Sequence, residues 1–266
     1  MEILCQHCNS DINANFCSNC GQKRFKRIDK KYVYDEIQYV LIHTNKGFLY
    51  SVKNIIKNPG KTALNFILGD RVSHYKPLLL AFLLSSISGF LSYKVLKMEH
   101  VMSEYFSTQH MNSAFMNDMM SFLSSYTSFI YLLLIPIFAL CTKISFSNWG
   151  HNYYEHVIMN SYIVSFYNIF SVIIVYPILY IFRTDANTFL IVTFISMLAI
   201  PLIIIRFFRN IYLGKQLPTI VWRSLLSILL VVVAYFILII AVVVGGFTYA
   251  AIKGPEALKY MMPEKV

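Results

Sequence analysis

The sequence is short of charged residues. Only 14% of its 266 residues are Asp, Glu, Lys or Arg, whereas a typical soluble domain has about 25%, and 57% of them are hydrophobic. This composition excludes an ordinary soluble globular protein. The apolar residues also gather in runs close to the roughly 20 residues that cross a bilayer as a helix. We therefore expect an all-α membrane protein.

The sequence also lacks familiar catalytic motifs. It contains no Walker A loop, no dinucleotide-binding G-x-G-x-x-G and no G-x-S-x-G elbow, so we expect no enzyme of these classes. The first residues, MEILCQHC, have neither the basic region nor the apolar stretch of a signal peptide. We therefore expect the first residues to lie in the cytosol, where thiols stay reduced.

Five runs are long and apolar enough to span a membrane. They predict a bundle over residues 77–252 and a tail over residues 253–266; the expected spans are residues 77–96, 122–140, 157–182, 188–205 and 225–252. The Met-rich loop at residues 97–121 predicts an amphipathic helix on the outer face. Pro136, Pro177 and Pro201 fall within spans, where transporters use helix breaks for substrate sites but tolerated kinks are commoner.

Positive charge is concentrated before the first span. Residues 1–76 carry 12 of the 23 Lys and Arg against 6 of the 13 acids. Cytoplasmic segments of membrane proteins are enriched in Lys and Arg, so we expect a bacterial inner-membrane protein with its N-terminus inside and its C-terminus outside. The same charges suit anionic lipids. Nucleic acid is a weaker interpretation, because Phe25 is the only aromatic residue in the basic run 23–31.

Four of the five cysteines fall within 16 residues as two C-x-x-C pairs, Cys5 with Cys8 and Cys17 with Cys20. This spacing is typical of tetrahedral Zn²⁺ sites. A disulfide framework would need an oxidising compartment, and a thioredoxin-like motif would need a βαβ context. We predict a zinc-ribbon knuckle over residues 1–24, with a structural Zn²⁺ and no open position for catalysis.

Residues 25–76 predict a basic linker followed by amphipathic helices. The apolar spacing over residues 32–57 is helical and suits helices in the headgroup zone, although a small soluble helical hairpin fits nearly as well. Asn58 is placed as an N-cap, with Pro59 at the first helical position. Gly69 is placed to end that helix.

Four polar residues are candidates for a site at the membrane interface. Arg71 and His74 precede the first span, and Glu155 and His156 open the third. Ionisable groups at such positions are functional candidates. The simpler interpretation is a polar helix end, in which Glu155 pairs with a basic residue such as Arg71 or Arg206.

Three segments together carry a resemblance. They are the knuckle ending FCSNCGQK, the pattern NPG-K-x-x-x-x-F-I-x-G-D-R-x-x-x-Y-x-P at residues 58–77, and Y-x-E-H at the start of the third span. The combination resembles a family of bacterial multi-pass membrane proteins of unknown function that is common in Bacteroidetes. The resemblance implies a zinc-ribbon protein of the inner membrane and brings no activity with it.

Two functions fit these features best. The first is a non-enzymatic scaffold or assembly factor, monomeric or homo-oligomeric, whose zinc ribbon docks a protein partner at the inner leaflet. The alternative is a transporter or channel that uses Glu155, His156 and the kinked spans. A weaker third hypothesis is a membrane enzyme that acts on lipid-linked substrates through Arg71, His74 and Glu155.

Overall fold

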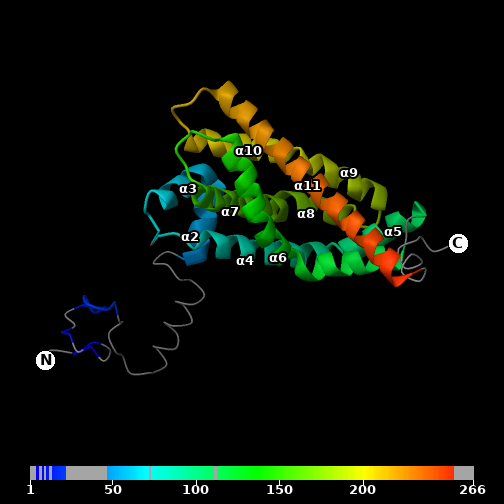
Figure 1. Ribbon diagram of the computed structural model, residues 1–266, viewed down its shortest axis with the longest axis horizontal. Coiled ribbons are helices and arrows are strands. Elements are labelled where there is room, and N and C mark those ends of the chain that lie inside the picture. Colours follow the sequence, from blue (N-terminus) through cyan, green and yellow to red (C-terminus); the bar gives the residue numbers. More distant parts are fainter. Residues whose placement is uncertain are drawn as a thin grey trace. The chain divides into compact units, whose positions relative to one another are not determined.

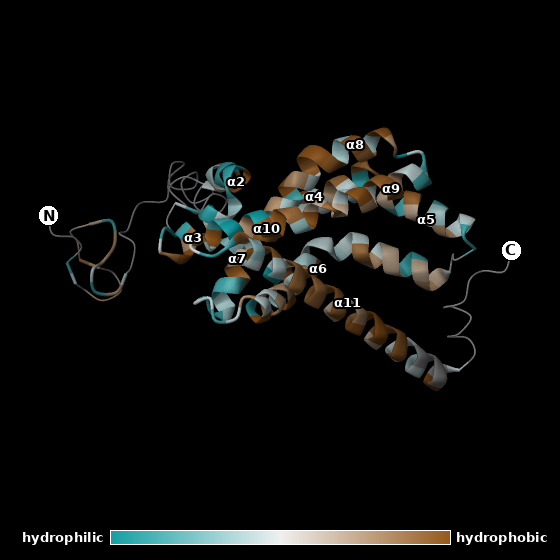
Figure 2. Ribbon diagram, turned by 90° about the horizontal axis from the view of Figure 1, so that it is seen from above, coloured by the Kyte–Doolittle hydropathy of each residue, from teal (hydrophilic) through white to brown (hydrophobic). Residues whose placement is uncertain are grey.

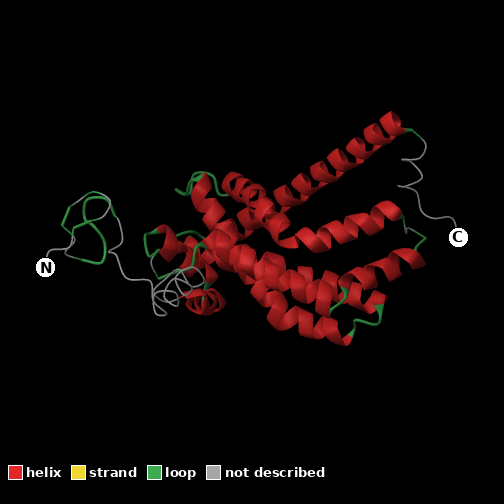
Figure 3. Ribbon diagram, turned by 90° about the horizontal axis from the view of Figure 1, so that it is seen from below, coloured by secondary structure: helices red, strands yellow, loops and turns green. Residues whose placement is uncertain are grey.

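The computed structural model of the protein describes residues 4, 5, 8, 10, 11, 14–21, 47–71, 73–110 and 113–254. The chain divides into two compact units, Met1–Asn45 and Lys46–Val266, which we describe separately. The described part of the first unit is the cysteine knuckle, with one isolated antiparallel bridge between Leu4 and Asp11. In the described part of the second unit, all regular elements are helices (Figure 1, Figure 3).

Five helical segments are long and apolar enough to cross a membrane, which confirms the predicted number. They are Pro77–Val95, Ala114–Ser145, Tyr153–Ile181, Ala186–Ile211 and Leu217–Gly246. Figure 2 shows the apolar residues along these helices, most continuously in the last. The second span starts at Ala114, earlier than predicted, because Ser113 caps it: its hydroxyl accepts the Met116 N–H at 3.2 Å. Hydropathy detects apolar residues, whereas capping decides where the backbone becomes helical.

Three of the spans are interrupted. The first combines α4 (Pro77–Phe90) with the π-helical turn η1 (Leu91–Val95). The other helices, in chain order, are α5 (Met98–Thr108), α6 (Ala114–Ser145), α7 (Tyr153–Phe170), the π-helical turn η2 (Ser171–Val175), α8 (Tyr176–Ile181), α9 (Ala186–Met197), α10 (Ala199–Ile211) and α11 (Leu217–Lys253). The helix predicted in the loop before the second span is thus present as α5.

Proline accounts for two of these interruptions. Pro177 is the second residue of α8, which begins directly after the end of η2 at Val175, and Pro201 lies in the first turn of α10, just after the break at Leu198. Proline has no N–H to donate to the preceding turn, so the helix there widens or restarts. Pro136 lies inside α6 without ending it. The predicted positions within spans are therefore confirmed for all three prolines.

Two short helices precede the first span. They are α2 (Gly47–Lys57) and α3 (Pro59–Ile67). The Asn58 side chain accepts the Lys61 N–H at 3.0 Å, with Pro59 at the first helical position, as predicted. Gly69, at φ 120°, follows the end of α3, also as predicted. The helical pattern predicted over residues 32–46 lies outside the described residues.

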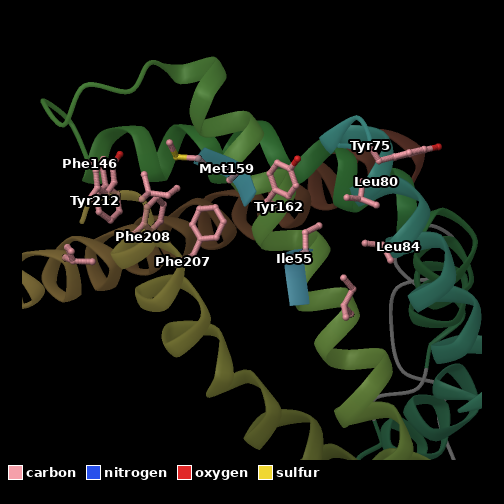
Figure 4. Close-up of a cluster of buried hydrophobic side chains, with 14 residues drawn as sticks. Ile55, Tyr75, Leu80, Leu84, Phe146, Met159, Tyr162, Phe207, Phe208 and Tyr212 are labelled. Carbon is pink, nitrogen blue, oxygen red and sulfur yellow. The ribbon is translucent and has the colours of Figure 1, made fainter. Parts of the chain in front are cut away.

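The helices α2 and α3 pack on the bundle. A large buried cluster joins Ile55 of α2, Leu80 of α4, Tyr162 of α7, and Phe207 and Phe208 of α10, each of them 0% exposed (Figure 4). This burial holds α2 and α3 against the bundle. The choice between interfacial helices and a soluble helical hairpin over residues 32–57 stays untested, because residues 32–46 lie outside the described residues. The depth of α2 and α3 relative to a membrane stays a prediction.

Polar side chains buried between helices hold α7 to its neighbours. The Asn168 amide donates to the Ser85 hydroxyl of α4 at 3.0 Å, and the Asn160 amide donates to the Thr142 hydroxyl of α6 at 2.8 Å. A polar group in hydrocarbon has no water to bond, so such contacts fix how neighbouring spans face one another.

The closest approach between α3 and α10 is at Gly60. A Cβ atom there would collide with the carbonyl oxygen of Phe207 and would lie 2.8 Å from Cβ of Asn210. Because the obstructing oxygen belongs to the backbone, a side chain at this position would push the two helices apart. Gly60 thus sets the distance at which α3 docks.

We predict that Gly60→Ala destabilises the protein by about 1–3 kcal/mol, the usual cost of overpacking. Helix propensity alone would predict the opposite sign, because alanine is the better helix former. The measurement is the unfolding temperature in detergent. Gly214→Ala is the matched control, since a Cβ there would meet nothing within 4 Å. Equal unfolding temperatures for the two variants would contradict the close contact.

Candidate functional site

The first candidate site is the cysteine knuckle. The sulfur atoms of Cys5, Cys8, Cys17 and Cys20 all lie within 4.8 Å of one another. The Cys5–Cys20 and Cys8–Cys17 sulfur pairs are 3.6 and 3.5 Å apart. In a tetrahedral site with bonds of about 2.3 Å, sulfur atoms lie about 3.8 Å apart. The four thiols therefore fit one tetrahedrally coordinated metal ion.

Two backbone turns bring these thiols together. The Cys5 N–H donates to the Ser10 carbonyl at 2.9 Å, and the Gly21 N–H donates to the Cys17 carbonyl at 2.9 Å. Gly21 adopts φ 74°, a left-handed conformation that glycine tolerates and most residues avoid. Gly21 thus permits the turn that follows the second cysteine pair.

The knuckle is held together mainly at its cysteines. Cys5 is 0% and Cys17 is 3% exposed, and half-buried Cys8 packs against them. Within the described residues of this unit, the larger apolar side chains do not join the cluster, since Leu4 and Phe16 are each 56% exposed. So little apolar burial cannot offset the entropy of folding. A bound metal ion would supply the missing stability.

The surroundings of the Cys8 thiol favour metal binding. Hydrogen bonds with the side chain and backbone of Ser10 lower the pKa of the half-buried Cys8 thiol to about 6. The thiolate is the form that binds a metal. Cys8 is therefore available as a ligand at neutral pH.

The second candidate set divides into two groups of contacts. Arg71 is exposed, with its guanidinium carbon 6.0 Å from the centre of the Phe66 ring. His74 is buried, with Nε2 3.7 Å from a carboxylate oxygen of Asp70 and its ring 5.5 Å from that of Tyr50. None of these contacts involves Glu155 or His156. A shared site of these four residues at the membrane interface stays a prediction.

Glu155 serves as a helix cap. Its carboxylate accepts the Asn152 N–H at 2.7 Å, and the Asn152 side chain accepts the Glu155 N–H at 3.0 Å, which together form a capping box at the start of α7. Within the described residues Glu155 forms no ion pair with Arg71 or Arg206. The Arg206 guanidinium instead donates to the Lys57 carbonyl at 3.2 Å. The polar helix end was predicted correctly, and its partner was not.

His156 belongs to a buried polar network. It is 0% exposed, and its Nδ1 lies 3.1 Å from the Thr142 hydroxyl, which also accepts the Asn160 amide at 2.8 Å. The other ring nitrogen, Nε2, is buried and has no hydrogen-bond partner within the described residues. A buried nitrogen of this kind needs an explanation, such as a water molecule or an ion.

Two neighbours of His156 carry similar buried atoms. The His151 ring lies 6.5 Å from the His156 ring and 5.3 Å from the Tyr212 ring. His151 Nδ1 and the Tyr212 hydroxyl also lack hydrogen-bond partners within the described residues. Burial lowers the pKa of His151, so its neutral form is favoured. The cluster thus holds three buried polar atoms without partners among the described residues. The four cysteines are the one group of three or more metal ligands found among those residues.

Sequence reasoning missed Thr142, Asn160 and Tyr212. The spacing of four residues between His156 and Asn160 places both on one helix face and was a usable signal. Thr142 and Tyr212 come from other helices, and no local pattern marks them.

Comparisons of the chain with protein-family models, with curated proteins and with solved structures found no match. The resemblance to the bacterial membrane-protein family therefore stays a prediction, carried by the residues of the knuckle, the segment 58–77 and the start of α7.

We predict that Thr142→Val destabilises the bundle by about 1–3 kcal/mol, because it leaves the buried Asn160 amide and His156 Nδ1 without their shared partner. The measurement is again thermal unfolding in detergent. Thr193→Val is the control, since the Thr193 hydroxyl donates only to Phe189 of its own helix, at 2.8 Å. If both variants unfold at the same temperature, the network does not hold α6 to α7.

Proposed function

We propose that the protein is a non-enzymatic scaffold or assembly factor of a bacterial inner membrane, with a knuckle that binds structural Zn²⁺ and docks a protein partner. The observation that carries this proposal is the cluster of four thiols within 4.8 Å of one another. Four protein ligands complete a tetrahedral shell, and a complete shell leaves no position for water or substrate. The knuckle is thus suited to stabilising a surface and not to catalysing a reaction.

The exposed side chains of the knuckle support a docking role. Phe16 lies directly before the ligand Cys17 and is 56% exposed, as is Leu4 directly before the ligand Cys5. Exposed aromatic side chains on a rigid support are frequent anchors of protein interfaces. Metal binding would fix the backbone conformation at Leu4 and Phe16.

The distribution of charge supports a cytosolic knuckle. Among the described residues at the end of the bundle that carries α3, ten are basic and two, Asp70 and Glu155, are acidic; the basic residues are Lys53, Lys57, Lys61, Arg71, Lys76, Lys143, Arg206, Arg209, Lys215 and Arg223. The described residues at the other end include three basic ones (Lys94, Lys97 and Arg183) and four acidic ones (Glu99, Glu104, Asp118 and Asp185). By the positive-inside rule the α3 end faces the cytosol. In the sequence, the knuckle precedes α2 and the first span.

A transporter or channel is the second candidate. It is favoured by the partnerless atoms of His151, His156 and Tyr212, because buried polar atoms of this kind often mark a route for protons or ions. Glu155, the other residue assigned to this candidate, has its carboxylate engaged in capping α7. Solute or proton flux in proteoliposomes that changes in His156→Gln would favour this candidate over the scaffold.

The docking proposal predicts a metal-dependent contact at Phe16. A photo-crosslinking amino acid in place of Phe16 in the full chain should capture a protein partner in native membranes. Adding Cys17→Ser to that chain should abolish the crosslink and lower the zinc content of the purified protein from one ion per chain to near zero. The physical reason is that three ligands no longer close the shell.

Cys141→Ser is the matched control, because Cys141 lies in α6, outside the knuckle. It should leave both crosslinking and zinc content unchanged. Unchanged crosslinking in the Cys17→Ser chain would count against docking through the knuckle. Iron in place of zinc in the purified protein would contradict the identity of the metal, since both suit a four-sulfur site.

A further inference from the structure

The end of the bundle remote from α3 carries two adjoining hollows with charged residues among their linings. One, of about 620 Å³, is lined by residues of η1, α5 and the first turns of α6. The other, of about 310 Å³, reaches the turn between α8 and α9. Lys97, His100 and Glu104 line both hollows and so form a common wall. Volumes of this size are typical of sites for small ligands.

The hollows present charges of both signs. Glu99 and Glu104 line the larger one, and Arg183 joins Lys97 in the smaller one. None of these four side chains forms an ion pair within the part of the chain that the structure describes. Arg183 instead lies over the Tyr180 ring, at 4.2 Å from its centre. Both signs of charge are therefore available to a bound molecule.

The hollows also lie where the spans end. Lys97 follows the end of the first span at Val95, and Arg183 lies between the third span, which ends at Ile181, and the fourth, which begins at Ala186. The ends of spans lie beside the polar headgroups of one leaflet. A lipid headgroup would reach this position without leaving the bilayer.

We propose that the two hollows together bind one zwitterionic group that joins an ammonium to a phosphate, as in phosphoethanolamine. The ammonium lies beside Glu99 and Glu104, and the phosphate lies beside Lys97 and Arg183. A purely anionic group would be repelled by the two carboxylates, and a purely cationic group by the two basic side chains. A primary ammonium donates hydrogen bonds to carboxylates, which a quaternary ammonium cannot do. The group is carried either by a lipid or by a free solute.

The test is native mass spectrometry of the full chain, released from nanodiscs that contain equal amounts of phosphatidylethanolamine, phosphatidylcholine and phosphatidylglycerol. We expect phosphatidylethanolamine to be retained preferentially, and water-soluble phosphoethanolamine to compete with it. If soluble phosphoethanolamine binds and no lipid is retained, the zwitterion site stands with a free solute as its ligand. Retention of phosphatidylglycerol equal to that of phosphatidylethanolamine would overturn the proposal, because it would reflect attraction to positive charge alone.

Substitutions of residues that line the two hollows test whether the group binds there. Arg183→Gln and Glu104→Gln should each weaken retention about tenfold, the factor expected for one charge-assisted hydrogen bond. Lys94→Gln is the control, because Lys94 is exposed on η1 and lines neither hollow. Retention that survives both site variants, or that falls equally in Lys94→Gln, would overturn the proposal.

Discussion

A polar side chain inside a bilayer has no water to bond, so it must find its partner in its own helix or in a neighbouring one. The helix α7 shows the effect of this constraint most clearly, because its polar side chains bond to two neighbouring helices. Asn160 reaches Thr142 of α6, and Asn168 reaches Ser85 of α4. These two bonds, about two helical turns apart, fix how α7 faces both neighbours. The apolar cluster around Tyr162 and the docking of α3 depend on that arrangement.

The two ends of the bundle differ in how they are built. At the α3 end, Phe146 stacks on Phe208 at 4.1 Å and on Tyr212 at 5.4 Å between ring centres, and Gly60 allows α3 to approach α10 closely. The opposite end is hollow and carries both basic and acidic residues. A tightly packed end gives a rigid arrangement of helices, whereas a hollow end suits a small ligand. The two proposals therefore concern separate parts of the molecule and can fail separately.

Features encoded over a few residues were predictable from the sequence. The Asn58 cap, the Gly69 turn and the paired cysteines each depend on neighbours within about five positions, and the five spans follow from hydropathy. The capping box of Asn152 and Glu155 was equally local, since N-x-x-E is its signature, yet Glu155 was assigned an arginine partner. The network at Thr142 was not predictable, because contacts between spans depend on how each helix is rotated. No pattern within one segment records that rotation.

The central claim is that a bound metal ion keeps the knuckle folded, whereas the helical bundle stays folded without a metal ion. Hydrogen exchange of the full-length protein, measured before and after treatment with a chelator, tests this most directly. We predict that the amides of Cys5 and Gly21, which close the two turns, lose protection when the metal is removed. The amides of α4, α6 and α7 should keep theirs. A protected knuckle after chelation, or loss of protection in α7, would contradict the account.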